Sequence, residues 1–159
     1  MGGIISRRFF LALPLGGCAA EGALFQPDSV SVSKGYGTIN VYRPLLGLGK
    51  QGEEPFVSIA RKSYGRMRPG SFVAATFPEG DYNVTLQQSV FLLVPTIPKT
   101  ISVTVVRGSQ SYVRVDQTID SIGITSGASV TQSISIEEVP FEVGQAELAK
   151  TRQNTRTAQ

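Results

Sequence analysis

Alternating apolar and polar residues fill much of the chain between residues 38 and 139. Side chains on a strand point to its two faces in turn, so this period of two predicts strands with one buried face. The residues assigned to buried faces are Ile39 and Val41; Val57 and Ile59; Tyr82, Val84 and Leu86; Ile101, Val103 and Val105; Val113 and Val115; and Ile134 and Ile136.

A further segment, SFVAATF at residues 71–77, is apolar on both faces, as expected of a central strand. Turn sequences separate these runs, because proline presets one turn dihedral and glycine accepts positive φ. About seven strands at short spacing predict an all-β fold, an antiparallel β-sandwich over residues 36–140. The expected turns are Arg68-Pro69-Gly70, Pro78-Glu79-Gly80-Asp81 and Arg107-Gly108-Ser109-Gln110.

The period changes after Pro140. A weak apolar stripe formed by Phe141, Ala146 and either Leu148 or Ala149 predicts a short helix near residues 142–152, although Gly144 costs a helix ~1 kcal/mol. Residues 154–159 are expected to fray. The last unit, residues 141–159, is therefore expected to be a short helix and a frayed tail.

The N-terminal segment has the order of a signal peptide. Arg7 and Arg8 precede a short apolar run, FFLALPL at residues 9–15. This run is well below the ~20 apolar residues that a membrane-spanning helix needs. We therefore expect residues 1–17 to be a leader that a peptidase removes.

The next residues, Leu15-Gly16-Gly17-Cys18, resemble a bacterial lipoprotein signal. This resemblance implies cleavage between Gly17 and Cys18, a diacylated Cys18 thiol and an acylated new amine. Two or more acyl chains anchor a protein stably, whereas one binds only marginally. Acylation also removes a thiol that an oxidising compartment would attack. The alternative is a small cysteine buried in the core.

Ala19 follows the cysteine, and the absence of aspartate there favours the outer membrane, facing the periplasm. Residues 18–35 comprise the lipidated cysteine and a small, polar tether. If flexible, 17 such residues would reach roughly 20–25 Å. The expected location is thus the bacterial cell envelope, with membrane contact through the acyl chains on Cys18.

Four stretches of the domain resemble a known family: GTINVYRP, FPEGDYNVTL, RGSQSYVRVDQ and SISIEEVPFEVGQAELAKTR. Together they cover residues 36–152 and resemble an uncharacterised family of bacterial envelope lipoproteins that carry a domain of unknown function. The PEG turn is also similar to PEGA-type repeats, which are small β-sandwiches. The resemblance implies a sandwich fold and an envelope location, and it supplies no catalytic residues.

Charge and composition limit the classes of function that the chain is expected to have. The net charge is +3, but without residues 1–17 the 13 basic and 12 acidic residues give +1. A nearly neutral chain has no electrostatic footprint for nucleic acid. The chain has no histidine, and its one cysteine has another expected role. No nucleophilic triad can be drawn, so we expect a protein that is not an enzyme and binds no cofactor.

Two motifs have ordinary explanations. Residues 47–52, GLGKQG, match GxGxxG, but a strand rather than a helix is expected next, so a mobile glycine loop is favoured over a nucleotide site. The pairs Glu53-Glu54 and Glu137-Glu138 are adjacent in sequence. Neighbouring residues on a strand point to opposite faces. A solvated face is therefore favoured over a carboxylate metal site, and no metal is expected.

Two segments are candidate contact surfaces. The stretch RKSYGRMR could bind an anionic ligand through Arg61, Lys62, Arg66 and Arg68. The favoured alternative is a charged hairpin that protects a sheet edge. The stretch SVFLLVPTIP could pack into the core, or it could present an apolar loop to a partner or membrane. The residues of that loop are Phe91, Leu92, Leu93, Val94 and Ile97.

The leading functional hypothesis is a non-enzymatic structural or assembly module with an envelope protein partner. The alternative is a module that binds glycan or peptidoglycan. Sugar-binding sandwiches stack their ligands on aromatic side chains, and this chain lacks tryptophan. An exposed row of tyrosines beside the basic hairpin would favour binding; the candidates are Tyr36, Tyr42, Tyr64 and Tyr112.

Overall fold

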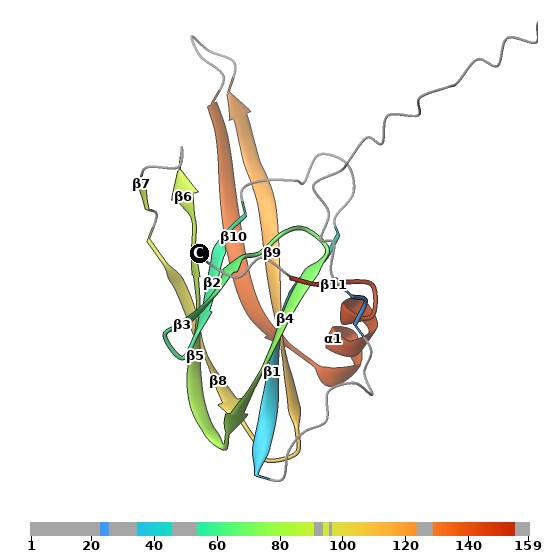
Figure 1. The fold of residues 1–159 in the computed structure, drawn as a ribbon. Coiled ribbons are helices and arrows are strands. Elements are labelled where there is room, and N and C mark those ends of the chain that lie inside the picture. The colour runs from blue at the N-terminus through green and yellow to red at the C-terminus, as the bar shows by residue number, and fades with distance from the viewer. Residues whose placement is uncertain are drawn as a thin grey trace, which may run out of the picture.

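The computed structural model describes residues 23–25, 35–45, 54–90, 94–95, 97–123 and 129–154. Two sheets face each other and a short helix lies on the outside of one of them (Figure 1). The predicted all-β sandwich with a short C-terminal helix is confirmed. None of the helices within the described ranges is long and apolar enough to cross a membrane.

The larger sheet has five strands in the order β10-β9-β1-β4-β11. Two of its pairings are parallel, β1 with β9 and β4 with β11, so the sandwich is not antiparallel throughout as predicted. Its strands are β1 (Tyr36–Arg43), β4 (Ser71–Pro78), β9 (Gln110–Gly123), β10 (Ser129–Val139) and β11 (Arg152–Gln153).

The smaller sheet has four strands in the order β3-β2-β5-β8 and is antiparallel throughout. A two-stranded ribbon, β6 (Ser89–Val90) with β7 (Val94–Pro95), lies between β5 and β8 in sequence. The strands of the four-stranded sheet are β2 (Phe56–Ile59), β3 (Lys62–Arg66), β5 (Gly80–Gln87) and β8 (Lys99–Val105).

The two sheets therefore contain nine strands where about seven were predicted. The additional strands are β3 and β11. Strand β3 lies within the charged stretch RKSYGRMR, where a hairpin but no strand bounds were predicted. Strand β11 has only two residues and lies at the predicted C-terminal end of the helix. Both escape a pattern search because they are short; β3 is only partly buried, and β11 is exposed.

The space between the sheets is the inner core, and it is aliphatic. Its members include Ile39, Val57, Val84 and Val103, each with no exposed surface. All the residues assigned by alternation to buried faces belong to this core or pack against it. The β-branched residues fit because their stiff side chains pack well on pleated sheets.

A second, outer core covers the opposite face of the five-stranded sheet. Helix α1 (Phe141–Leu148) lies across this face (Figure 1). The buried residues of the outer core are Phe25, Tyr42, Phe72, Tyr112 and Leu148. Residues 37–43 of β1 are consequently buried on both faces, although alternation predicted only one buried face there.

The helix approaches the sheet at Gly144. A Cβ atom added there would lie far inside van der Waals contact of the Tyr112 ring. The predicted stripe is therefore right at Leu148 and wrong at Phe141 and Ala146: the buried helix residues are Gly144 and Leu148, while Phe141 and Ala146 are exposed. Phe141 instead meets the edge of Tyr112, with ring centroids 5.6 Å apart.

The helix ends at Leu148, earlier than the predicted residue 152, because the chain turns to pair with β4. The Thr151 hydroxyl donates to the Leu148 carbonyl at 2.7 Å and stabilises this end. The predicted fraying also begins too early, since the Asn154 side chain donates to the Arg66 carbonyl at 2.8 Å. Residues 155–159 lie outside the described ranges.

Part of the predicted tether is packed against the domain. Leu24 forms an antiparallel bridge with Arg152, so residues 23–25 add a short extended segment beside β11. Phe25 is only 5% exposed, and its ring meets the edge of Phe72 at a centroid distance of 5.3 Å. Residues 18–35 are therefore not a continuous free tether.

The predicted turns occur where expected. Gly70, before β4, has φ +71°, and Gly108, between β8 and β9, has φ +74°. Both values lie in the left-handed region that glycine adopts without steric cost. The PEG turn joins β4 and β5.

Candidate functional site

Several predicted site residues lie outside the part of the chain that the structure describes. They are Gly17 and Cys18 of the expected cleavage and lipidation site; Phe91, Leu92 and Leu93 of the apolar loop; and Glu53 with residues 47–52 of the glycine motif. The lipidation and cleavage assignments remain predictions.

The described part of the apolar loop is a ribbon. Val94 belongs to β7, which pairs with β6. Ile97 follows the ribbon and is 89% exposed, so this member of the loop does not pack into the core. The choice between core and contact surface stays open for the other members.

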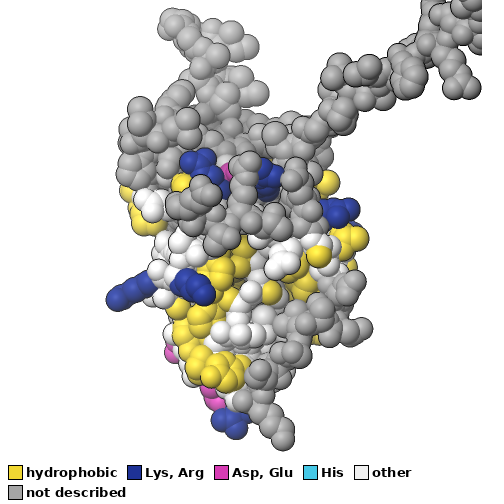
Figure 2. Space-filling model, in the orientation of Figure 1, with side chains coloured by type: hydrophobic (Ala, Val, Ile, Leu, Met, Phe, Trp, Pro, Cys, Tyr) yellow, Lys and Arg dark blue, Asp and Glu magenta, His cyan; other side chains and the backbone are white. Residues whose placement is uncertain are grey.

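The basic cluster does not form one anion site. Lys62 lies 5.5 Å from the centre of the Tyr64 ring, and Arg66 lies 4.7 Å from that of Phe56. Arg68 pairs with Glu54 at 3.5 Å. Lysine and arginine side chains form separate groups on the face shown in Figure 2. Of the four, Arg61 lines the pocket that is described below.

The tyrosines do not form an exposed row. Tyr42 and Tyr112 are buried in the outer core, and Tyr64 is half-buried beside Lys62. Tyr36 is 42% exposed at the start of β1. The arrangement that would have favoured stacking of a sugar on these four tyrosines is absent.

An ion-pair network that the sequence did not predict links α1 to the sheet. Arg114 on β9 contacts Glu137 on β10, Glu147 on α1 at 3.2 Å and Asp116 at 3.6 Å. Glu147 also accepts a hydrogen bond from the Tyr42 hydroxyl at 2.6 Å. Burial, followed by this bond, raises the pKa of Tyr42. The network is structural, since it fixes the helix on the outer core.

Arg43 is a second unpredicted charged residue, and it is 1% exposed on the inner side of β1. Its guanidinium donates to the Met67 carbonyl at 3.1 Å and to the Gln117 side chain. Burial lowers its pKa, while the charges of Glu54 and Asp116 oppose that shift. A buried cation of this kind needs such partners, and here they join β1 to β9 and to the loop before β4.

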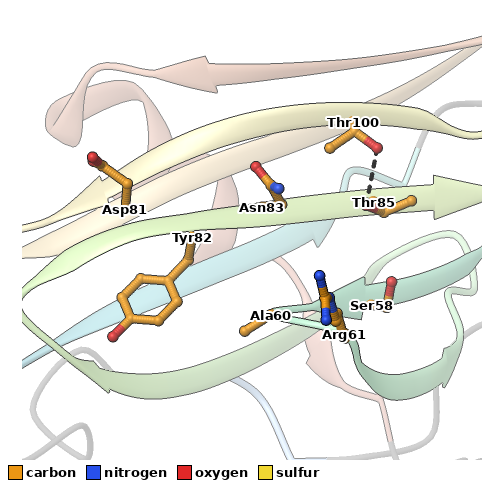
Figure 3. Close-up of a pocket in the computed structure, with 8 residues that line it drawn as sticks. All are labelled: Ser58, Ala60, Arg61, Asp81, Tyr82, Asn83, Thr85 and Thr100. Atoms are coloured by element: carbon orange, nitrogen blue, oxygen red, sulfur yellow. Dashed lines mark hydrogen bonds between the residues drawn. The ribbon is translucent and has the colours of Figure 1, made fainter.

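The outer face of the four-stranded sheet carries an open pocket of about 430 Å³. Figure 3 shows Arg61 and Ser58 at one side of it and Asp81 at the other. Most of the residues that line it carry a hydroxyl, amide or charged group. The lining residues are Ser58, Ala60, Arg61, Asp81, Tyr82, Asn83, Thr85 and Thr100.

Neighbouring strands cross-link the floor of this pocket. The hydroxyls of Thr85 and Thr100 are 2.9 Å apart, and the Thr104 hydroxyl donates to Asp81 at 2.6 Å. Tyr82 closes one end, where its ring packs against Phe77 with centroids 4.6 Å apart. The floor is thus a preformed array of hydrogen-bonding groups.

The turn beside the pocket has an unusual backbone. Ala60 and Arg61 connect β2 to β3, with φ values of 51° and 67°. Positive φ at both central residues matches a type I′ turn, which favours Asn-Gly. For Ala and Arg the left-handed conformation costs ~1–2 kcal/mol each. A hydrogen bond from the Ala60 amide to the Asn83 carbonyl at 3.0 Å holds this geometry.

The sequence did not reveal this pocket, because its residues come from three strands and a turn. One signal was present: polar residues alternate with the core residues along β5 and β8. No group of three or more metal-ligating side chains occurs among the described residues. Comparisons with protein-family models, curated proteins and solved structures give no match to this chain.

Proposed function

We propose that the protein is a lipid-anchored lipoprotein of the bacterial cell envelope that acts as a non-enzymatic structural or assembly module. The observation that carries this proposal is the order of Arg7 and Arg8, the short apolar run and Leu15-Gly16-Gly17-Cys18. Residues 23–25 support it, because their contacts fix the chain to the domain a few residues after Cys18.

The position of β10 at an edge of the described sheet supports the assembly role. Strand β10 stands at the end of the five-stranded sheet, and no described strand pairs with its outer edge. Strands β9 and β10 also run beyond the rest of the sandwich as a long hairpin (Figure 1). Unpaired backbone groups on such an edge can receive a strand from another chain.

Intact mass tests the anchor. The full chain is expressed in a bacterial host, and its membrane fraction is analysed by mass spectrometry. The expected product lacks residues 1–17 and carries a diacylglycerol and an acyl group on Cys18. The Cys18→Ser variant is the control and stays unmodified. An uncleaved chain with a free Cys18 thiol would overturn the anchor.

Site-specific crosslinking tests the assembly role. A photoreactive residue at Ser135, exposed on β10, should give one discrete crosslinked species in membranes. The same residue at Glu79, exposed in the β4–β5 turn, is the matched control and should give none. Identical patterns at the two positions would contradict a partner on the β10 edge.

The pocket supports a second candidate, binding of a glycan such as a peptidoglycan fragment. Its hydroxyl and amide groups suit sugar hydroxyls, and Arg61 suits a carboxylate on the same ligand. Calorimetric titration with soluble muropeptides tests it. Asn83→Ala should weaken binding about tenfold, whereas Ser102→Ala, exposed on β8 and absent from the pocket lining, should not. No heat of binding would remove this candidate.

A further inference from the structure

The N-terminal part of the described chain is attached to the domain by a short ladder. The Gln153 amide donates to the Ala23 carbonyl at 2.6 Å, and the Phe25 amide donates to the Thr151 carbonyl at 3.1 Å. Phe25 is buried against Phe72. The position of residues 23–25 is therefore fixed by the domain.

Only four residues separate Ala23 from Cys18. A fully extended chain spans at most about 3.6 Å per residue, so the Cα atoms of Cys18 and Ala23 are no more than about 18 Å apart. This limit is shorter than the hydrocarbon core of a bilayer, which is about 30 Å thick. A membrane that holds acyl chains on Cys18 must lie close to the surface around Ala23.

That surface presents two leucines and two cations. Leu24 is 50% exposed and is the bridge partner of Arg152, whose amide donates to the Gly70 carbonyl at 2.8 Å. Leu45 is 60% exposed, and its side chain lies next to Gly70. Lys150 is exposed two residues before Arg152. We call Leu24, Leu45, Lys150 and Arg152 the anchor-side surface.

We propose that the anchor-side surface lies against the lipid headgroups, so that the domain is held on the membrane in one orientation. Apolar side chains enter the headgroup region, and lysine and arginine side chains are attracted to an anionic membrane surface. This inference rests on the proposed function, because it requires an anchor at Cys18.

The proposed orientation on the membrane determines where the other candidate surfaces lie relative to the lipid. Leu24 and Leu45 lie beside β11, at one edge of the five-stranded sheet, whereas β10 forms the opposite edge. A bilayer against the anchor-side surface leaves the outer edge of β10 and the outer face of the four-stranded sheet uncovered. The short connection thus presents the proposed partner edge away from the lipid.

Single tryptophan probes test the orientation, because the natural chain contains no tryptophan. Leu45→Trp places a probe on the anchor-side surface, and Thr104→Trp places a matched probe on the exposed face of β8. The acylated proteins are reconstituted in 3:1 phosphatidylethanolamine–phosphatidylglycerol vesicles containing a headgroup-nitroxide lipid. We expect at least threefold stronger quenching for Leu45→Trp. Equal quenching of the two probes would overturn the inference.

A longer connection between Cys18 and Ala23 tests whether the short connection causes the orientation. Insertion of 20 Gly/Ser residues between Glu21 and Gly22 should lower quenching of the Leu45→Trp probe by half or more. Unchanged quenching would show that the short connection does not position the domain, and would overturn the inference.

Failure of the anchor itself is distinguishable by mass. If Cys18 is not acylated, the proposed function fails, but the full chain can be coupled through its single cysteine to a maleimide phospholipid. The same pair of tryptophan probes then reports on the orientation from the same anchor residue. Stronger quenching of Leu45→Trp would support the inference, and equal quenching would overturn it.

Discussion

The two sheets share the inner core, but their outer faces differ in whether another part of the chain covers them. The outer face of the five-stranded sheet is covered by α1 and Phe25, and these bury Tyr42 and Tyr112. The outer face of the four-stranded sheet is open and carries short polar side chains, of which Asn83 is an example. The covered face fixes residues 23–25, and the open face is available to a ligand.

The two cores of the five-stranded sheet also differ in chemistry. The inner core is almost entirely aliphatic, whereas the outer core is largely aromatic and hydrogen-bonded at its rim. The Tyr42 hydroxyl bonds Glu147, and the Tyr112 hydroxyl bonds Gln110 at 3.1 Å. Tyrosines suit a thin outer layer because they bury a ring and keep a polar group near its edge.

The largest effect is expected from a cavity in the inner core. Ile39 has no exposed surface, so Ile39→Ala should lower the free energy of unfolding by about 3 kcal/mol. Urea denaturation followed by circular dichroism measures this loss. Because Ile39 lies between the sheets, hydrogen exchange should accelerate across both of them.

Phe25→Ala is the matched truncation in the outer core. Residues 23–25 can undock without opening the sandwich, so exchange should accelerate mainly there, in α1 and in β11. Hydrogen-exchange mass spectrometry separates the two patterns. If Phe25→Ala accelerated exchange in β2, β5 and β8 as much as Ile39→Ala, the two cores would be one cooperative unit and the comparison would fail.

The second prediction concerns the contact of α1 with the outer core. Gly144→Val places atoms where the Tyr112 ring lies, and such overpacking should destabilise the fold by about 2 kcal/mol. Ala146→Gly, at an exposed helix position, is the control and should cost only ~1 kcal/mol through helix propensity. Thermal unfolding of both variants checks the difference. A Gly144→Val variant as stable as the natural protein would contradict the close approach of α1 to Tyr112.

The sequence predicted the inner core well and the outer core poorly, for a physical reason. Alternation records which residues of one strand share a face, and Val84 and Leu86 illustrate its success. The outer core joins Phe25, Tyr42 and Leu148 from distant segments, and no local period records such contacts. Gly144 was interpreted only as a cost to the helix, because its partner Tyr112 lies 32 positions earlier in the sequence.

The pocket was missed for the same reason, since sheet pairing brings its residues together. The basic cluster shows the opposite error, in which residues close in sequence were considered as one site. Lys62, Arg66 and Arg68 are close in sequence, yet each has a different partner. Charges that are near in sequence need not converge in space.

The third prediction uses the polar rim of the outer core. Tyr42→Phe removes a hydrogen bond to a charged group and should cost about 1.5 kcal/mol at pH 7. The raised pKa adds a pH dependence. The folded state holds the Tyr42 proton above pH 10, where the unfolded state releases it, so this contribution to stability is complete below pH 10 and falls as pH rises further.

Urea denaturation between pH 8 and 11 tests this linkage. The natural protein should lose stability more steeply above pH 10 than Tyr42→Phe does. Tyr36→Phe, at an exposed tyrosine outside the outer core, is the control for removal of one tyrosine hydroxyl. Parallel profiles for the natural protein and Tyr42→Phe would contradict the proposed burial of this hydroxyl.

The smallest effect is expected at the open face, and it has the opposite sign. Replacing Ala60-Arg61 by Asn-Gly supplies residues that accept positive φ, so the double variant should be about 1 kcal/mol more stable. Arg61→Lys retains both the charge and the strained backbone, and should leave stability unchanged. Thermal unfolding measures the stability of both variants. A loss of stability in the Asn-Gly variant would contradict backbone strain at Ala60 and Arg61.

The same pair of variants connects strain to function. Backbone strain of this kind concentrates at functional sites. The strained turn therefore suggests a function for Arg61, namely to contact a ligand in the pocket. The more stable Asn-Gly variant should then bind muropeptides more weakly, and Arg61→Lys should bind with intermediate affinity. Unchanged affinity in both variants would mean that Arg61 contributes nothing to the pocket.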